Sequence, residues 1–134
     1  MKVLIDIGDD KILDALISGV EGGISYWCRA VEGYASLVRC ERVPHSRSEP
    51  EALRGAAFSA WCEGGGKLVM FEHDAHDCEL GARYVLDGAA IARGLAVLGK
   101  QYPHLLADVL DGTGDATTGD ALIQCAIFGR LVYG

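Results

Sequence analysis

The sequence has few basic residues, few prolines and no long apolar run. Its 12 Lys and Arg stand against 19 Asp and Glu, giving a formal net charge of −7 and a pI of about 4.9. This acidic balance argues against a general phosphate-binding surface, so we expect no direct nucleic-acid binding. No stretch is long and apolar enough to span a bilayer, and no basic flank precedes a long apolar segment near the start. We therefore expect a cytoplasmic protein that makes no membrane contact.

The cysteines lack the pattern of a disulfide framework. Their number is odd, no two are spaced CxxC, and no secretion signal accompanies them. Free thiols in a reducing compartment fit this pattern, and most free cysteines pack as small apolar core residues. The five are Cys28, Cys40, Cys62, Cys78 and Cys125.

The sequence does contain enough apolar material for one core. It has 134 residues, of which 50% are hydrophobic, so global disorder is excluded. A chain of this length buries roughly two thirds of its unfolded surface and needs neither a metal nor a disulfide to form a core. We find no internal repeat and no linker, so we expect residues 1–134 to form a single domain.

The apolar pattern predicts an α+β fold. Runs of β-branched and aromatic residues predict strands, and a hairpin over about 67–86 is the most economical pairing. Apolar residues at helical spacing predict several helices, packed on one side of a small antiparallel sheet. We expect strands at 2–7, 67–73 and 82–86, extended chain at 31–43 and 131–133, and helices at about 9–21, 48–63, 88–99, 103–110 and 120–128.

Capping residues predict several helix boundaries. Ser48 and Glu51 form a potential capping box around Pro50 at the start of one helix. Asp87 is a potential N-cap of another helix. The pair Gly22-Gly23 predicts the end or a kink of the first helix, because adjacent glycines lower helix propensity and permit left-handed backbone.

The most polar stretch is residues 111–120. It fails the EF-hand pattern, because Ala116 and Leu122 occupy the positions of the essential glycine and glutamate. It also lacks the third glycine of a phosphate-binding loop, and its carboxylates would repel phosphate. We predict an exposed acidic loop that attracts the basic groups of a partner. The candidate partner-binding residues are Asp108, Asp111, Asp115 and Asp120.

A second candidate site lies at the predicted hairpin tip. His73, His76 and Cys78 are potential ligands for zinc or a related metal. Their spacing is not a standard zinc pattern, and alternation along a strand would point His73 and His76 to opposite faces. Only a tight turn would bring them together. A polar tip that contains histidines is the favoured interpretation, and we expect no bound cofactor.

A third candidate site combines polar residues that stand among apolar ones. Glu21, Asp120 and Gln124 must be hydrogen-bonded if they are buried. Mutual capping explains them structurally, and a ligand pocket is the functional interpretation. No Gly-x-Ser-x-Gly elbow is present, and no local signature pairs a cysteine with a histidine. An enzyme is therefore the less favoured interpretation, although it stays open.

Two segments resemble a family of small uncharacterised proteins from phages and other mobile elements. They are EGGISYW at 21–27 and DALIQCAIFGRLVYG at 120–134. The family also tends to have an aspartate-rich loop before its last helix, as at 111–120 here, and a segment similar to residues 91–95. The resemblance brings no established chemistry with it. It implies an accessory gene of a phage or prophage.

Small acidic proteins of such elements often act by binding, and some inhibit host defence, including CRISPR effectors. The resemblance therefore implies a binding protein in the host cytoplasm, such as an anti-CRISPR inhibitor, whose partner is a host protein or ribonucleoprotein complex. One alternative is a metal- or small-molecule-binding protein, enzymatic or not, built on the second or third candidate site. Another is a homo-oligomer with an apolar interface.

Overall fold

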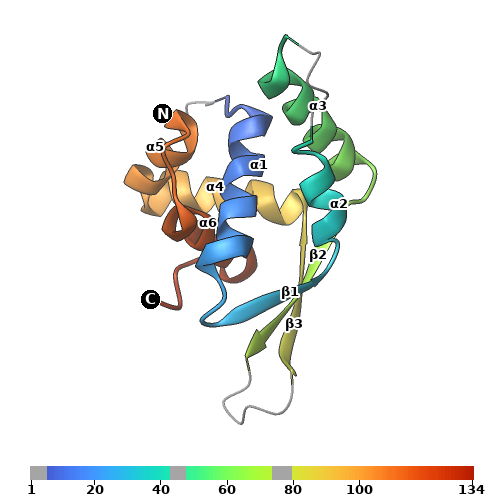
Figure 1. Cartoon of the computed structure of the whole chain (residues 1–134). Helices are drawn as coiled ribbons and strands as arrows, with labels where there is room; N and C mark the ends of the chain where they lie inside the picture. The colour runs from blue at the N-terminus through green and yellow to red at the C-terminus, as the bar shows by residue number, and fades with distance from the viewer. Residues whose placement is uncertain (1–5, 43–47, 74–79) are drawn as a thin grey trace.

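The computed structural model describes residues 6–42, 48–73 and 80–134. A small sheet lies below a group of helices (Figure 1). This is the predicted α+β fold, a small antiparallel sheet packed against several helices. The α-helices are α1 (Asp9–Ser18), α2 (Tyr34–Arg39), α3 (Pro50–Glu63), α4 (Gly88–Gln101), α5 (Pro103–Asp111) and α6 (Ala116–Phe128); the strands are β1 (Cys28–Glu32), β2 (Lys67–His73) and β3 (Leu80–Asp87); and a π-helical turn, η1 (Gly19–Gly23), continues α1.

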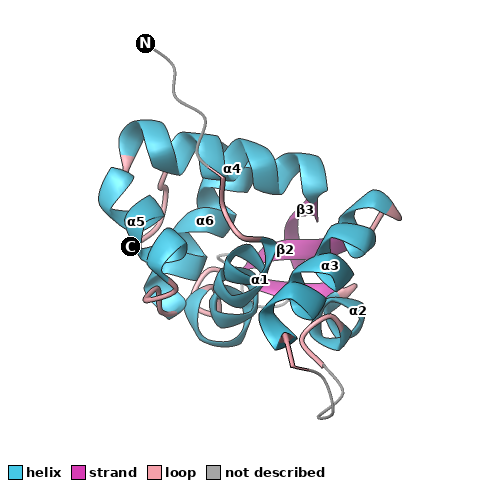
Figure 2. Cartoon of the chain, turned by 90° about the horizontal axis from the view of Figure 1, so that it is seen from above, coloured by secondary structure: helices cyan, strands magenta, loops and turns pink. Residues whose placement is uncertain are grey.

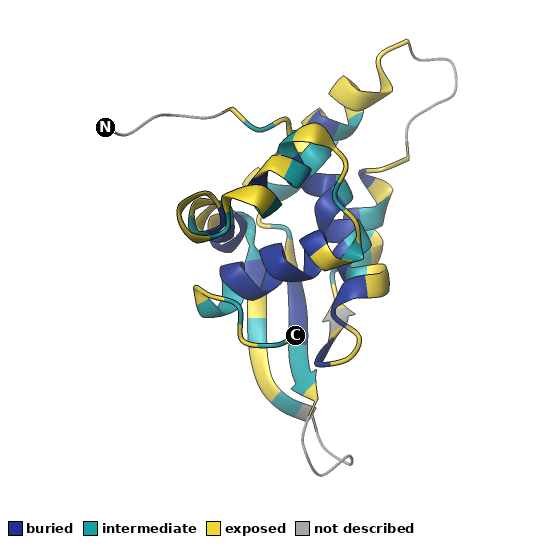
Figure 3. Ribbon diagram, turned by 90° about the vertical axis from the view of Figure 1, so that its left-hand side faces the viewer, coloured by how far each residue is buried: buried dark blue, intermediate teal, exposed yellow. Residues whose placement is uncertain are grey.

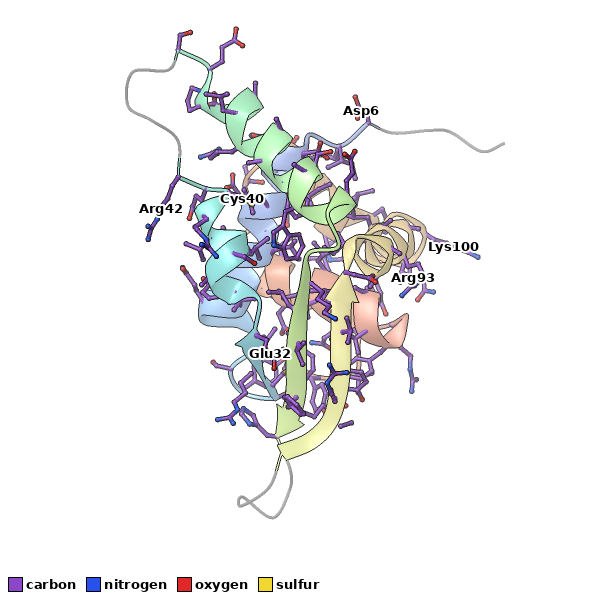
Figure 4. All side chains as sticks on the ribbon, turned by 90° about the vertical axis from the view of Figure 1, so that its right-hand side faces the viewer. Asp6, Glu32, Cys40, Arg42, Arg93 and Lys100 are labelled. Carbon is purple, nitrogen blue, oxygen red and sulfur yellow. The ribbon has the colours of Figure 1, made fainter. Side chains whose placement is uncertain are left out.

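The sheet is antiparallel in the order β1-β2-β3, and β2 and β3 form the predicted hairpin. Leu68 and Met70 of β2 and Leu86 of β3 alternate onto the face that the helices cover, and each is at most 1% exposed. No helix of the described residues crosses the opposite face, which is toward the viewer in Figure 4. The sheet is thus one layer with its core on one side.

Helix α6 lies at the centre of the core. It lies between α1 and α4 in Figure 2, and the buried residues in Figure 3 concentrate around it. Every residue from Thr118 to Ala126 is buried, as expected for a helix that is apolar on nearly all sides. A Cβ on Gly119 would lie 2.3 Å from the Ala15 carbonyl oxygen, so only glycine permits this crossing of α1 and α6. The polar side chains between Thr118 and Ala126 are therefore drawn into the interior.

Several predicted elements are confirmed. Asp87 caps α4, because its Oδ1 accepts the N–H of Ala90 at 2.9 Å. Helix α5 begins at Pro103, where the missing N–H costs no hydrogen bond. The first helix widens into η1 and ends at Gly23, as the glycine pair predicts.

The prediction of extended chain over 31–43 is wrong for α2. Gly33 has a φ of +86° and turns the chain out of β1 into a helix. A side chain there would collide with the Lys67 carbonyl, since a Cβ would lie 1.9 Å from its oxygen. Alternating apolar and charged residues suggest a strand, but Tyr34 and Leu37 also recur at helical spacing. The helix forms because it places Leu37, which is 0% exposed, in the core.

Two helix starts differ from the prediction. Helix α3 begins at Pro50 after an N-cap, Glu49, whose side chain makes no capping bond, so the predicted capping box is wrong. Helix α6 begins at Ala116 rather than at residue 120. Asp115 caps it, with Oδ1 accepting the N–H groups of Thr117 and Thr118 at 2.9 and 3.2 Å. The predicted loop is therefore shorter, and Asp120 lies inside the helix.

The ends of the chain form no described strand. The predicted strand 2–7 lies largely outside the described residues, and Asp6 and Ile7 are irregular. Residues 131–133 do not pair with the sheet.

The four cysteines of the described residues are free thiols, as predicted. Cys28, Cys40 and Cys125 are buried, and burial raises the pKa of Cys28 and Cys125 to about 11. Cys78 lies outside the described residues.

The described part of the chain contains no helix with both the length and the apolarity that a membrane span requires.

Candidate functional site

Asp120 is a buried carboxylate at the centre of a hydrogen-bond network. It is 7% exposed and lies on α6. The Tyr26 hydroxyl donates to its Oδ2 at 2.7 Å, and the Trp27 indole N–H donates to its Oδ1 at 2.8 Å. The amide of Gln124, one helical turn later, donates to the same Oδ1 at 2.9 Å. Three neutral donors thus form hydrogen bonds to a carboxylate that α6 carries into the core.

Gln124 connects this network to the last residues of the chain. It is 1% exposed, and its Oε1 accepts the backbone N–H groups of Val132 and Tyr133, each at 2.8 Å. Gly129, with a φ of +73°, ends α6 in the left-handed conformation and allows the chain to fold back along the helix. The Gln124 side chain therefore donates to the Asp120 carboxylate and also positions Val132 and Tyr133.

Aromatic packing closes the other side of the network. The Trp27 and Tyr133 rings stack with centroids 5.0 Å apart and planes 12° from parallel. The Tyr26 ring meets Tyr133 edge-on at 6.4 Å and 84°. Offset and edge-on pairs are favourable beyond the area that they bury. The residues that contact Asp120 are therefore held by packing as well as by hydrogen bonds.

A second carboxylate lies next to the first network. Glu72 of β2 accepts a hydrogen bond from the Tyr133 hydroxyl at 2.7 Å and another from the Tyr84 hydroxyl. Tyr133 thus joins Glu72, through its side chain, to Gln124, through its backbone. The hydrogen bond to Glu72, more than burial, raises the pKa of Tyr84 to about 12.

The pKa of the Tyr26 phenol is raised as well. Although Tyr26 is 54% exposed overall, its hydroxyl points at the buried Asp120. Desolvation of the hydroxyl, followed by the hydrogen bond to Asp120, raises the pKa of Tyr26 to about 12. Tyr26 is therefore a protonated donor at neutral pH.

An open cavity of about 440 Å³ lies against this network. Its volume is within the range of small-ligand sites. It combines polar groups with apolar walls, and none of the described residues that line it is Lys, Arg or His. The lining residues are Gly22, Gly23, Tyr26, Leu105, Thr117, Asp120, Ala121, Gln124, Leu131, Tyr133 and Gly134.

The third predicted site is thus assembled in part. Asp120 and Gln124 meet and line the cavity, as the pocket interpretation expects. Glu21 is exposed and accepts a hydrogen bond from the Tyr34 hydroxyl at 2.7 Å, away from the Asp120 network. Its neighbour Gly22 lines the cavity, so Glu21 flanks the site without joining it.

The predicted acidic loop is only partly an exposed acidic surface. Asp111 and Asp115 are exposed and Asp108 is half-buried. Asp120 is buried in its own network, so its assignment to this surface is corrected: the early start of α6 turns it inward. Lys11 also lies over the loop, because a Cβ on Gly112 would be 2.7 Å from its Nζ.

The predicted metal site is not assembled in the described part of the chain. His73 is exposed, and its Nε2 lies 2.8 Å from the Ser25 carbonyl oxygen. His76 and Cys78 lie outside the described residues. Among the residues that the structure describes, no three His, Cys, Asp or Glu side chains gather as metal ligands.

Sequence reasoning missed the aromatic members of the site. It places Tyr26, Trp27 and Tyr133 in none of the three candidate sites. A signal was present, because residues 21–27 and 120–134, the two segments singled out in the sequence analysis, are the two that meet here. Each contains residues that the other needs as hydrogen-bond partners.

Comparisons with protein-family models, with curated proteins and with solved structures found no match to this chain.

Proposed function

We propose that this is a phage or mobile-element accessory protein that acts by binding a host protein or ribonucleoprotein complex, as an anti-CRISPR or related inhibitor of host defence does. The resemblance of residues 21–27 and 120–134 to the phage family supports the context. The acidic balance, with a net charge of −7, supports a basic partner surface.

The observation that carries the proposal is the charge around the connection of α5 to α6. Asp111 and Asp115 are exposed there, and Asp108 is half-buried. Two residues after Asp115, Thr117 lines the cavity that contains Asp120. Carboxylates in this arrangement compete for arginines and lysines that otherwise hold phosphates. Such a protein inhibits by occupying a basic nucleic-acid-binding surface.

Affinity capture from a nuclease-treated host lysate tests this function. The test variant is Asp108→Asn with Asp111→Asn; Asp115 is left intact because it caps α6. The control is Glu49→Gln with Glu51→Gln, which removes the same charge from exposed residues at the start of α3. We expect a stoichiometric partner whose capture weakens with salt and with the test variant but not with the control. No partner at low salt, or equal capture by both variants, would overturn the proposal.

The second candidate function is binding of a small molecule, enzymatic or not, and the cavity beside Asp120 favours it. Native mass spectrometry of untagged protein, together with metal analysis, separates the candidates. A retained ligand that is lost on Asp120→Asn supports this function. A bound metal lost on His73→Ala would instead indicate the site at the hairpin. Ligand-free and metal-free protein with full partner capture would remove this second candidate.

A further inference from the structure

The carboxylate of Asp120 retains one unused hydrogen-bonding position. An ionised carboxylate offers about four acceptor positions. Oδ1 accepts from Trp27 and Gln124, whereas Oδ2 accepts only from Tyr26. Because Asp120 lines the cavity, the remaining position on Oδ2 is available to a donor that enters there.

The charge of Asp120 has no cation beside it within the described residues. Its three donors, a phenol, an indole and a primary amide, are neutral. The only ion pairs between described residues join Arg54 to Asp10 and to Asp14, on other elements. Buried charges in proteins are usually paired, and an unpaired one attracts a cation. The cavity therefore favours positively charged ligands over neutral or negative ones.

The walls of the cavity suit a cation carried on an apolar stem. Tyr26 and Tyr133 are among its lining residues, and aromatic side chains attract ammonium and guanidinium groups. Leu105, Ala121 and Leu131 supply apolar surface against which methylene groups pack. Exposed Asp115 and Glu21 are close in the chain to the lining residues Thr117 and Gly22, and both carry the same sign of charge as Asp120.

We infer that this cavity binds an alkylguanidinium or alkylammonium group, with its N–H on Asp120 Oδ2 and its stem along Leu105 and Leu131. The inference rests on the proposed function, in which a partner's arginine or lysine side chain supplies this group. A free alkylamine or alkylguanidine has the same chemistry, and the experiment distinguishes the two sources.

The two tryptophans provide matched reporters. The Trp27 indole N–H donates to Asp120, whereas the Trp61 indole N–H donates to the Ser36 hydroxyl at 2.9 Å, on other elements. The protein labelled with ¹⁵N is titrated with butylguanidinium and, separately, with its neutral isostere butylurea. We expect butylguanidinium to shift the Trp27 indole signal saturably, to leave Trp61 unchanged, and to bind at least tenfold more tightly than butylurea. Absence of a Trp27 shift, or equal responses to the two compounds, would overturn the inference.

Two pairs of variants test the geometry. Asp120→Asn keeps the shape and should weaken butylguanidinium binding by about tenfold or more, whereas Asp111→Asn, on the surface, should not. Thr117→Arg places a guanidinium at the cavity and should block binding, whereas Thr113→Arg adds the same charge on the neighbouring loop and should not. Thr117 and Thr113 are both exposed, so these variants keep the test decisive even if Asp120→Asn unfolds.

Partner capture by the two threonine variants distinguishes a partner's side chain from a free cation as the occupant of the cavity. Loss of partner capture on Thr117→Arg but not on Thr113→Arg indicates a partner side chain. Binding of butylguanidinium without any captured partner supports a free cation and removes the proposed function. If the unmodified protein binds no butylguanidinium and Thr117→Arg captures the partner normally, the proposed function stands and the cavity inference is overturned.

Discussion

At the scale of single residues, the network around Asp120 depends on one acceptor. Tyr26, Trp27 and Gln124 all direct donors at this carboxylate. Removing one partner of a buried hydrogen bond costs more than the bond contributes, because the remaining groups are desolvated without compensation. The network is therefore more sensitive to loss of Asp120 than to loss of any one donor.

Asp120→Ala should lower the free energy of unfolding by about 2–4 kcal/mol, because three donors lose their acceptor and a small void opens. Asp120→Asn should cost less, since its carbonyl still accepts from Trp27 and Gln124. Urea denaturation of both variants measures the difference. Asp111→Ala, at an exposed position, should change stability by about 0.5 kcal/mol or less. An equal effect of Asp120→Ala and Asp111→Ala would contradict the network's role.

Gln124→Leu should release the chain after Gly129. The backbone N–H groups of Val132 and Tyr133 lose their acceptor, while the leucine fills a similar volume. We expect a loss of about 1–3 kcal/mol and faster amide exchange at Val132 and Tyr133. Gln101→Leu, at the exposed end of α4, is the matched control. Unchanged exchange at both amides would show that Gln124 does not hold this segment.

At the scale of elements, small residues decide how closely α6 packs. A Cβ on Gly119 would lie 2.3 Å from the Ala15 carbonyl oxygen and 2.5 Å from the Gly19 backbone nitrogen. These neighbours are backbone atoms, which move only if whole elements move. The crossing of α6 with α1 and η1 therefore positions Asp120 opposite Tyr26 and Trp27.

Gly119→Ala should destabilise the fold by about 3 kcal/mol, although alanine is the better helix former, because overpacking outweighs propensity here. Gly99→Ala on α4 is the control: it is exposed, and its nearest neighbour is a flexible methyl group of Leu106 at 3.2 Å. It should be neutral or slightly stabilising. Thermal denaturation compares the two, and a stabilising Gly119→Ala would contradict the packing argument.

At the scale of the whole molecule, phenols with raised pKa values couple stability to pH. Tyr26 and Tyr84 have pKa values raised to about 12, and Tyr34 and Tyr133 are raised as well. An unfolded tyrosine titrates near about 10. The folded state therefore holds the phenolic protons more tightly, and the associated stability is fully present below about pH 10.

Stability should consequently fall as the pH rises from about 10 through about 12. Urea denaturation at a series of pH values measures this slope, in a reducing buffer that keeps the thiols intact. Tyr26→Phe and Tyr84→Phe should each flatten the slope, since each removes one raised phenol. Cys28 and Cys125, whose pKa values are also raised, add a loss of the same sign. A stability that stays constant up to about pH 12 would refute this coupling.

Local signals determined much of the fold. The hairpin of β2 and β3, the cap at Asp87 and the start of α5 at Pro103 all depend on residues close together in the sequence. Where two local patterns competed, tertiary burial decided between them. At α2 the helix forms because it places Leu37 in the core. The early start of α6, in contrast, has a local cause, because Asp115 caps it.

The sequence by itself determined the α+β class, the acidic charge, the free thiols and the pairing of Asp120 with Gln124, which are one helical turn apart. Only the tertiary structure decided that this pair faces Tyr26, Trp27 and Tyr133 across a cavity. Contacts between residues more than 90 positions apart leave no periodicity in the chain. They arise because α6, apolar on nearly every side, must be buried, and its few polar groups must then find their partners inside.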